Sequence, residues 1–360
     1  MKKVILILIL MLMMIGLSAL EYDISGAIRF RAVVANDEFE DDGGWVDNRF
    51  NIGFDSQFHK YLKFRIAAEI GDITWGNGGG GINTGANINI RELFVKPYIE
   101  LLDADVSIGQ LYWKDKMGLV MDDYFSGVIF HKDINNNLST ELAWMKVEEN
   151  ALYNSDDMNV ILAHASMNTD VPYGAYIFYG VDNFLDLENL TLMPYMSMDM
   201  DKLNFDATVF LDLQMDDDTD VGLGAAVKTG LMLDDFEIGA DILVATENGL
   251  TTISPWYQNG LYIYGIGEYH DRVNLYWNTP YDGNEDFFAS IVGRLKAPIN
   301  EKIKAFGAAG YLIDLGTELN VGLEYELIPD LSHVAAYFAT GFHDNDTFNY
   351  ILGTSLQVEF

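Results

Sequence analysis

The sequence contains no cysteine and few basic residues. Without cysteine, the chain has no disulfide, no thiolate chemistry and no attachment site for a lipoprotein anchor. Only 21 Lys and Arg residues stand against 55 Asp and Glu residues, which gives a net charge of −34. Binding to nucleic acid needs a basic surface, so this composition excludes nucleic acid as a partner.

Continuous apolar runs are also missing from most of the chain. Hydrophobic residues make up 49% of the sequence, yet beyond residue 20 no segment approaches an apolar run of about 18 residues. This excludes membrane-spanning helices in that part of the chain. Apolar content that is high but never continuous is typical of strands whose two faces differ.

Residues 1–20 have the pattern of a secretory signal peptide. Lys2 and Lys3 precede an unbroken apolar run over residues 4–15, and small residues follow up to Ala19. A charged start, a short apolar core and small residues near the cleavage site are typical of such peptides. A membrane anchor is the alternative, but the run is shorter than the roughly 20 residues that a span needs. We therefore expect a cleaved signal peptide over residues 1–20 and a mature domain over residues 21–360.

The last stretch, residues 347–360, alternates between apolar and small or polar side chains. Successive side chains of a strand point to opposite faces, so this stretch predicts a strand with one apolar face. It ends on Phe360, which is also the last residue. The stretch resembles the closing strand of bacterial outer-membrane β-barrels. That resemblance implies that the barrel-assembly machinery binds this end of the chain through Phe360.

Similar alternation recurs along the whole chain and predicts 18 strands. Short connections alternate with longer, mostly acidic ones, as in membrane barrels with short periplasmic turns and long external loops. The fold class predicted is all-β: a transmembrane, antiparallel, up-and-down β-barrel in the bacterial outer membrane, in contact with lipid and lipopolysaccharide. A hairpin over residues 260–268 and 272–277 would raise the count to 20. A soluble multi-sheet protein is the alternative, but it would have more than seven prolines and less regular spacing.

Two local features stand out within this pattern. The acidic residues 38–44 read as a loop between the first two strands. The alternation of the fourth strand breaks at Arg91–Glu92, which predicts a β-bulge.

Charged residues of opposite sign gather on opposite sides of the predicted barrel. Five of the seven arginines fall in the first four strands. In a ring of 18 strands, strands two to four stand across from strands eleven to thirteen, whose inward positions are acidic. Opposed charges of this kind filter solutes in a water-filled pore. Pairing with neighbours on adjacent strands, for example through Asp55 and Glu69, is the alternative role. The basic wall comprises Arg29, Arg31, Arg49, Lys63, Arg65 and Arg91. The acidic wall comprises Asp206, Asp212, Asp220, Glu237 and Asp241.

An aromatic stretch over residues 247–285 is the best candidate for a functional loop. Its members include Trp256, Tyr257, Tyr262 and Trp277. A long loop at a pore mouth that folds inward constricts the pore, and rings of this kind stack on sugars through their apolar faces. The alternatives are an extra hairpin or a packed lid with its own core.

Short motifs in the first 130 residues resemble the alginate-export family of outer-membrane porins. The resemblance implies an 18-strand channel with a basic lumen suited to anionic sugars. The residues that carry it are Arg29 and Arg31; Gly71, Asp72, Trp75 and Gly76; Arg91 and Glu92; Gly109 and Gln110; and Phe125 and Gly127.

No pattern of catalytic or metal-binding residues is visible. The six histidines are scattered without metal-ligand spacing, and no Ser-centred elbow is present. The acidic residues 216–220 lack the Gly and the distal Glu of a calcium loop. We therefore expect no enzyme activity and no cofactor. The predicted function is a porin for passive diffusion of small hydrophilic solutes, among them anionic sugars or oligosaccharides. A closed structural or adhesive barrel is the alternative.

Overall fold

The chain forms one closed β-barrel. The computed structural model describes residues 21–37, 40–75, 87–149, 157–182, 187–215, 219–269, 286–342 and 348–360. The predicted signal peptide therefore lies outside the described residues. Within them, no helix is long and apolar enough to cross a membrane.

The described residues form 18 strands. They are β1 (Glu21–Asp37), β2 (Glu40–His59), β3 (Leu62–Thr74), β4 (Asn87–Ile99), β5 (Ala104–Lys114), β6 (Asp122–Asp133), β7 (Leu138–Glu149), β8 (Asp157–Met167), β9 (Tyr173–Asp182), β10 (Leu187–Met200), β11 (Leu203–Met215), β12 (Thr219–Leu233), β13 (Phe236–Ala245), β14 (Phe288–Asn300), β15 (Ile303–Leu312), β16 (Gly316–Ile328), β17 (Ser332–Phe342) and β18 (Phe348–Glu359).

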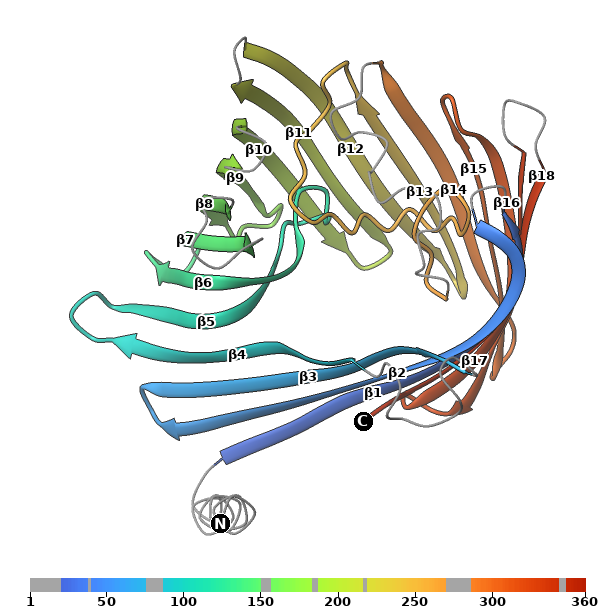
Figure 1. Cartoon of the computed structure of the whole chain (residues 1–360), viewed down its shortest axis with the longest axis horizontal. Helices are drawn as coiled ribbons and strands as arrows, with labels where there is room; N and C mark the ends of the chain where they lie inside the picture. The colour runs from blue at the N-terminus through green and yellow to red at the C-terminus, as the bar shows by residue number, and fades with distance from the viewer. Residues whose placement is uncertain are drawn as a thin grey trace.

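Each strand pairs antiparallel with its neighbours in sequence, and β1 closes the ring against β18 (Figure 1). The backbone of Phe360 completes this junction, because its N–H and C=O both bond to Gly26 at 3.0 and 2.8 Å. The prediction of an 18-strand, up-and-down barrel is confirmed. The 20-strand alternative is wrong in its first half, because residues 260–268 contain no strand. Its second half, residues 272–277, lies outside the described residues.

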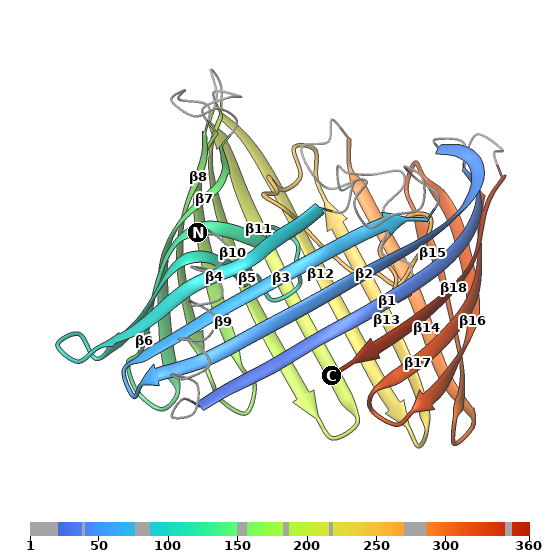
Figure 2. The same cartoon turned by 60° about the horizontal axis from the view of Figure 1, so that its bottom comes forward.

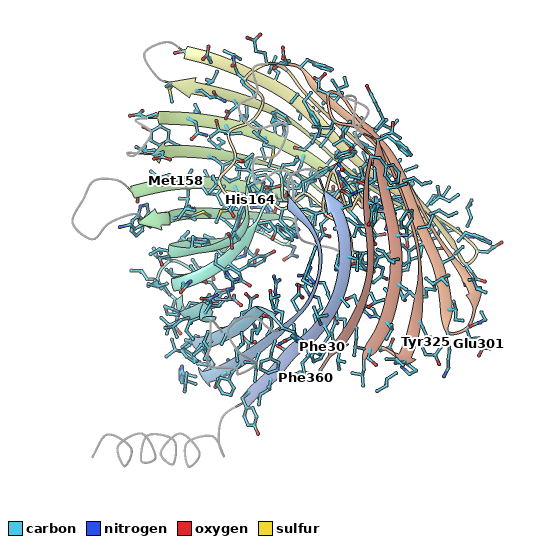
Figure 3. The ribbon with its side chains drawn as sticks, turned by 45° about the vertical axis from the view of Figure 1, so that its right-hand side comes forward. Phe30, Met158, His164, Glu301, Tyr325 and Phe360 are labelled. Atoms are coloured by element: carbon cyan, nitrogen blue, oxygen red, sulfur yellow. The ribbon has the colours of Figure 1, made fainter. Side chains whose placement is uncertain are left out.

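The two faces of the strands differ as the alternation predicts. Large apolar side chains on the outer face are exposed, for example Val209, Leu223 and Ile238. Figure 3 labels Phe30, Tyr325 and Phe360 on this outer side and His164 on the inner side. An exposed apolar band around a closed barrel is the surface that lipid covers. Inward residues on the same strands, such as Phe210 and Asp212, are buried.

The two ends of the barrel carry different connections (Figure 2). Short turns join each even strand to the next odd one, as at residues 60–61, 201–202 and 234–235. Three of these turns contain an Asp with positive φ: Asp103, Asp234 and Asp330. Asp tolerates that conformation better than most residues, so part of the acidic excess sits in turns.

The structure tests both local features. The register between β3 and β4 shifts at Arg91, which is an extra residue between Ile90 and Glu92, so the predicted bulge is confirmed. The loop predicted over residues 38–44 is wrong in most of its length. The segment from Glu40 onward belongs to β2, because Gly43 and Gly44 pair with Ala35 and Val34.

Candidate functional site

The basic wall lies on the inner face of β1–β4, and four of its guanidinium groups form ion pairs within that wall. Arg31 binds Asp47 through two hydrogen bonds, Nε–Oδ1 at 3.0 Å and Nη2–Oδ2 at 2.8 Å, and its side chain is only 3% exposed. Trp45 Nε1 donates to the same carboxylate at 3.2 Å. Arg31 and Asp47 therefore form a buried ion pair, and Arg31 does not act as a free charge in the lumen.

Three further arginines of the wall, Arg49, Arg65 and Arg91, are paired but half-buried. Arg65 binds Glu92 (Nε–Oε2, 2.6 Å) and also Asp55. These contacts hold the guanidinium groups in place while their outer parts stay in reach of water.

Glu69 joins two arginines of the same wall. Its Oε1 accepts from Arg91 Nη2 at 2.5 Å, and Arg49 Nε lies 3.8 Å from its other oxygen. The side chains of Arg49, Arg65 and Arg91 are 25%, 31% and 35% exposed. The inner face of β1–β4 is thus a charged surface of both signs.

The acidic wall is not continuous, because its members occupy different environments. Asp212 and Asp241 are buried; Asp241 pairs with Arg294 at 3.0 Å. Asp206 accepts from Ser197 at 2.6 Å and pairs with Lys116 at 3.3 Å. Asp220 and Glu237 are exposed; each is the second residue of its strand, and because β12 and β13 are antiparallel they lie at opposite ends of the barrel.

A short loop over residues 115–121 folds into the barrel from the end of β5. The carboxylate of Asp115 holds its shape by accepting hydrogen bonds from the five backbone N–H groups of residues 117–121, at 2.8–3.2 Å. Burial raises the pKa of Asp115, and the amide hydrogen bonds act against that rise. The loop side chains Leu119 and Met121 are fully buried.

These loop side chains belong to an apolar core inside the barrel. The inner faces of β5–β10 supply most of its wall, with residues such as Met145, Leu162 and Phe178. An apolar inner wall covered by an inward loop is sealed from water. The sequence indicated this internal core, because both faces of these strands are apolar.

A second inward loop, residues 246–269, crosses the barrel and is fixed at three places (Figure 1). Near its start, the N–H and hydroxyl of Thr251 donate to buried Asp212 at 2.9 and 2.6 Å. In the middle, Trp256 N–H donates to the carbonyl of Gly118 at 2.8 Å, which ties the two inward loops together. Asp212 is therefore an anchor for this loop.

The far end of this loop is held by Glu318 on β16. Its carboxylate is fully buried and accepts from the backbone N–H groups of residues 262–264 at 2.6–2.9 Å. Asn320, on the same strand, donates to the carbonyl of Gly260 at 2.8 Å. The loop thus spans the barrel from β11 to β16.

The loop aromatics face the barrel wall. Tyr257 is buried with Lys228 Nζ 4.5 Å from its ring centroid, and Tyr262 lies 4.9 Å from the ring of Tyr337. Trp256 is half-buried, and Trp277 lies outside the described residues. The rings of Tyr257 and Tyr262 are therefore covered by protein.

Two histidines that are distant in sequence meet on the inner wall. The two oxygens of Glu141 lie 3.2 Å from His131 Nδ1 and 3.0 Å from His164 Nδ1, and His164 Nε2 lies 3.0 Å from the Tyr195 hydroxyl. Within the described ranges, no group of three or more His, Asp or Glu residues is arranged to hold a metal ion.

Comparisons with solved structures identify the fold. The chain is similar to OccK3 (OpdO) of Pseudomonas aeruginosa, with 12% identity over 94% of this chain and 96% of that one, and a TM-score of 0.63. OccAB4 of Acinetobacter baumannii gives 10% identity over 94% and 98%, with a TM-score of 0.64. OpdK of Pseudomonas aeruginosa, solved with vanillate, gives 11% over 94% and 98%, with a TM-score of 0.61.

The fold is that of an outer-membrane porin. At these identities the likeness concerns the barrel and not the lumen chemistry. No family model matches the sequence, and no curated protein matches it significantly.

Sequence reasoning missed the residues that shape the lumen most. In the sequence Asp115, Glu318 and Asn320 look like ordinary loop or inward polar residues, because their partners are backbone N–H and C=O groups. Asp47 and Glu92, which bind two of the predicted basic residues, stand on neighbouring strands where charged pairs are common.

Proposed function

We propose that the protein is a porin of the bacterial outer membrane through which small hydrophilic solutes diffuse passively. The observation that carries the proposal is the half-exposed charged surface of β1–β4 inside a closed barrel whose outer face is apolar. Asp115 holds the shape of the first inward loop, and Asp212 and Glu318 fasten the second loop to the other walls. Solutes therefore pass along the inner face of β1–β4.

Small anions are the solute class that this surface favours. Arg49, Arg65 and Arg91 present partly hydrated guanidinium groups, which bind carboxylates well. The structure of OpdK was solved with vanillate, a small aromatic carboxylate. The resemblance to the alginate-export family suggests anionic sugars within the same class. The neighbouring carboxylates reduce the net field, so we expect a preference for anions rather than exclusion of cations.

Contact with lipopolysaccharide and with the barrel-assembly machinery belongs to the same proposal. The exposed acidic residues at the loop end, such as Asp220, suit bridging of lipopolysaccharide phosphates by divalent cations. Phe360 lies at the β1–β18 junction, with its ring 6.5 Å from that of Phe50 on the outer side. An aromatic at the closing strand is well placed for the machinery that closes the barrel.

Conductance in planar lipid bilayers tests the porin. We expect stepwise openings and, in a salt gradient, a reversal potential that indicates anion preference. Absence of any conductance would favour a closed structural or adhesive barrel. Swelling of protein-containing liposomes in neutral sugars and in small carboxylates would then rank the solutes.

A further inference from the structure

The pairing between β4 and β5 is incomplete. β4 pairs with β3 from Asn87 to Pro97, and β5 pairs with β6 from Asp105 to Lys114. Between β4 and β5, however, the register runs only from Ile99–Ala104 to Leu93–Gln110. The upper parts of the two strands, residues 87–92 and 111–114, therefore face each other without hydrogen bonds between their backbones.

Gly109 marks the point where the two strands separate. Its φ of 139° is unfavourable for residues with a side chain, and a Cβ there would lie 2.2 Å from the carbonyl oxygen of Leu93. Beyond it, β5 bends toward the barrel interior, as Figure 1 shows. The cause is the internal core: Leu111 is buried, and the Trp113 ring lies 5.5 and 5.7 Å from those of Tyr176 and Phe178.

Polar and aromatic side chains line the gap between the two strands. The guanidinium of Arg91, the bulged residue of β4, lies 5.3 Å from the ring centroid of Tyr124 on β6. The rings of Tyr112 and Tyr124 are 5.4 Å apart. Arg91 also reaches Glu69 on the lumen side, and its Nε has no hydrogen-bond partner among the described residues. Arg91 therefore connects the lumen with the gap.

The outer side of the gap is apolar. Ile90 and Leu93 on β4 and Ile108 on β5 are exposed large apolar residues of the outer face. In hydrocarbon, unpaired backbone groups persist only where water, protein or a polar ligand group satisfies them. A strand edge that is unpaired beside an apolar surface thus fits a molecule with a polar head and an apolar chain.

We propose that the gap between β4 and β5 is a lateral opening that binds amphipathic anions, with a compact oxyanion head at Arg91 and a single alkyl chain along Ile90, Leu93 and Ile108. This rests on the proposed porin function and adds a solute class to it. The head replaces the missing partner of Arg91 Nε and accepts from unpaired strand N–H groups. Tyr112 and Tyr124 cover the first methylenes. Such a solute leaves the lumen sideways, toward the membrane.

Current block by decanesulfonate tests the opening, because the wild-type chain has no cysteine and the gap can be bridged uniquely. The variant carries Ile88→Cys and Lys114→Cys, one on each free edge. It is treated with a bifunctional maleimide, and the matched control is the same variant capped with a monofunctional maleimide. Single-channel conductance in salt alone tests the porin function separately. If no conductance is seen, the porin function is contradicted and the gap has not been tested by this measurement alone, so block by decanesulfonate is compared only in proteins that conduct.

We expect bridging to raise the half-blocking concentration of decanesulfonate at least tenfold, because the closed gap no longer admits the head group to Arg91. A tenfold change corresponds to the loss of about one charge-assisted hydrogen bond. Conductance in salt alone should stay the same in the bridged and capped proteins. Methanesulfonate, which has no chain, should block neither. Equal block of the bridged and capped proteins by decanesulfonate would overturn the lateral opening.

A second comparison does not depend on cross-linking. Arg91→Gln should raise the half-blocking concentration about tenfold, because the head group loses its charged partner. Lys304→Gln, which removes a positive charge on β15 and so on a different wall, is the control and should change it less than about twofold. If both variants shift the block equally, decanesulfonate binds in the lumen and the proposal is wrong.

Discussion

The wall formed by β1–β4 and the wall formed by β5–β10 have similar outer faces, but the inner face of the first is charged and that of the second is apolar. Outside, both expose large apolar residues, such as Ile52 on the first and Ile161 on the second. Inside, β1–β4 carries half-exposed ion pairs, whereas β5–β10 carries Met145, Leu162 and other apolar residues under an inward loop. Lipid imposes one pattern on every strand, and each inner face is free to differ. The inner face therefore decides where solutes pass.

The largest expected effect comes from removing the carboxylate that shapes the loop on the apolar wall. Asp115→Ala deprives five backbone N–H groups of their acceptor, and each buried, unpaired amide costs about 1–3 kcal/mol. We expect the loop to leave the internal core and the barrel to lose its heat-resistant migration in gels at a lower temperature. Asp170→Ala, which removes an exposed charge in the turn between β8 and β9, is the control. Unchanged migration would mean that the loop is held by its apolar side chains alone.

The next effect tests whether the second loop is fixed rather than mobile. Glu318→Ala removes the acceptor of three backbone amides, at about 1–3 kcal/mol each, and should free the loop end near residues 262–264. Chymotrypsin should then cut at Tyr262 or Tyr264, and single-channel conductance should rise. Glu326→Ala, on the same strand near the turn, should leave both unchanged. A resistant loop in the Glu318 variant would contradict the anchoring role.

A smaller effect separates the exposed from the buried arginines of the basic wall. The double substitution Arg49→Gln and Arg65→Gln removes two half-exposed positive charges, so the reversal potential should move toward cation preference. Arg31→Gln removes a charge that is 3% exposed and bound to Asp47, and it should lower stability with little change in selectivity. Equal shifts in selectivity for both variants would show that exposure does not decide the filter.

The smallest effect concerns the acidic wall. Asp220→Asn removes an exposed charge at the end of its strand, where salt screens interactions beyond about 10 Å at 0.1 M. We expect a slight shift of the reversal potential toward anion preference, visible at low salt and lost at high salt. A shift that persists in concentrated salt would place Asp220 inside the narrow part of the pore.

The sequence was sufficient for the barrel. Alternation at Leu203–Asp212 and at Phe348–Glu359 marked strands and their outer faces, because a strand in lipid must present one apolar side. The bulge at Arg91 was also readable, since an extra residue breaks a period of two. These are local properties, and each is written within a few neighbouring residues.

Only the tertiary structure decided what the inner charges do. Asp212 and Glu318 follow the same inward pattern as Asp220, yet they accept amides from a loop tens of residues away, while Asp220 faces solvent. Which carboxylate meets which backbone group depends on how two loops fold into one cavity. The separation of β4 from β5 has the same origin, because the buried core around Trp113 draws β5 inward. Periodicity sets the direction of a side chain, and packing across the barrel sets its partner.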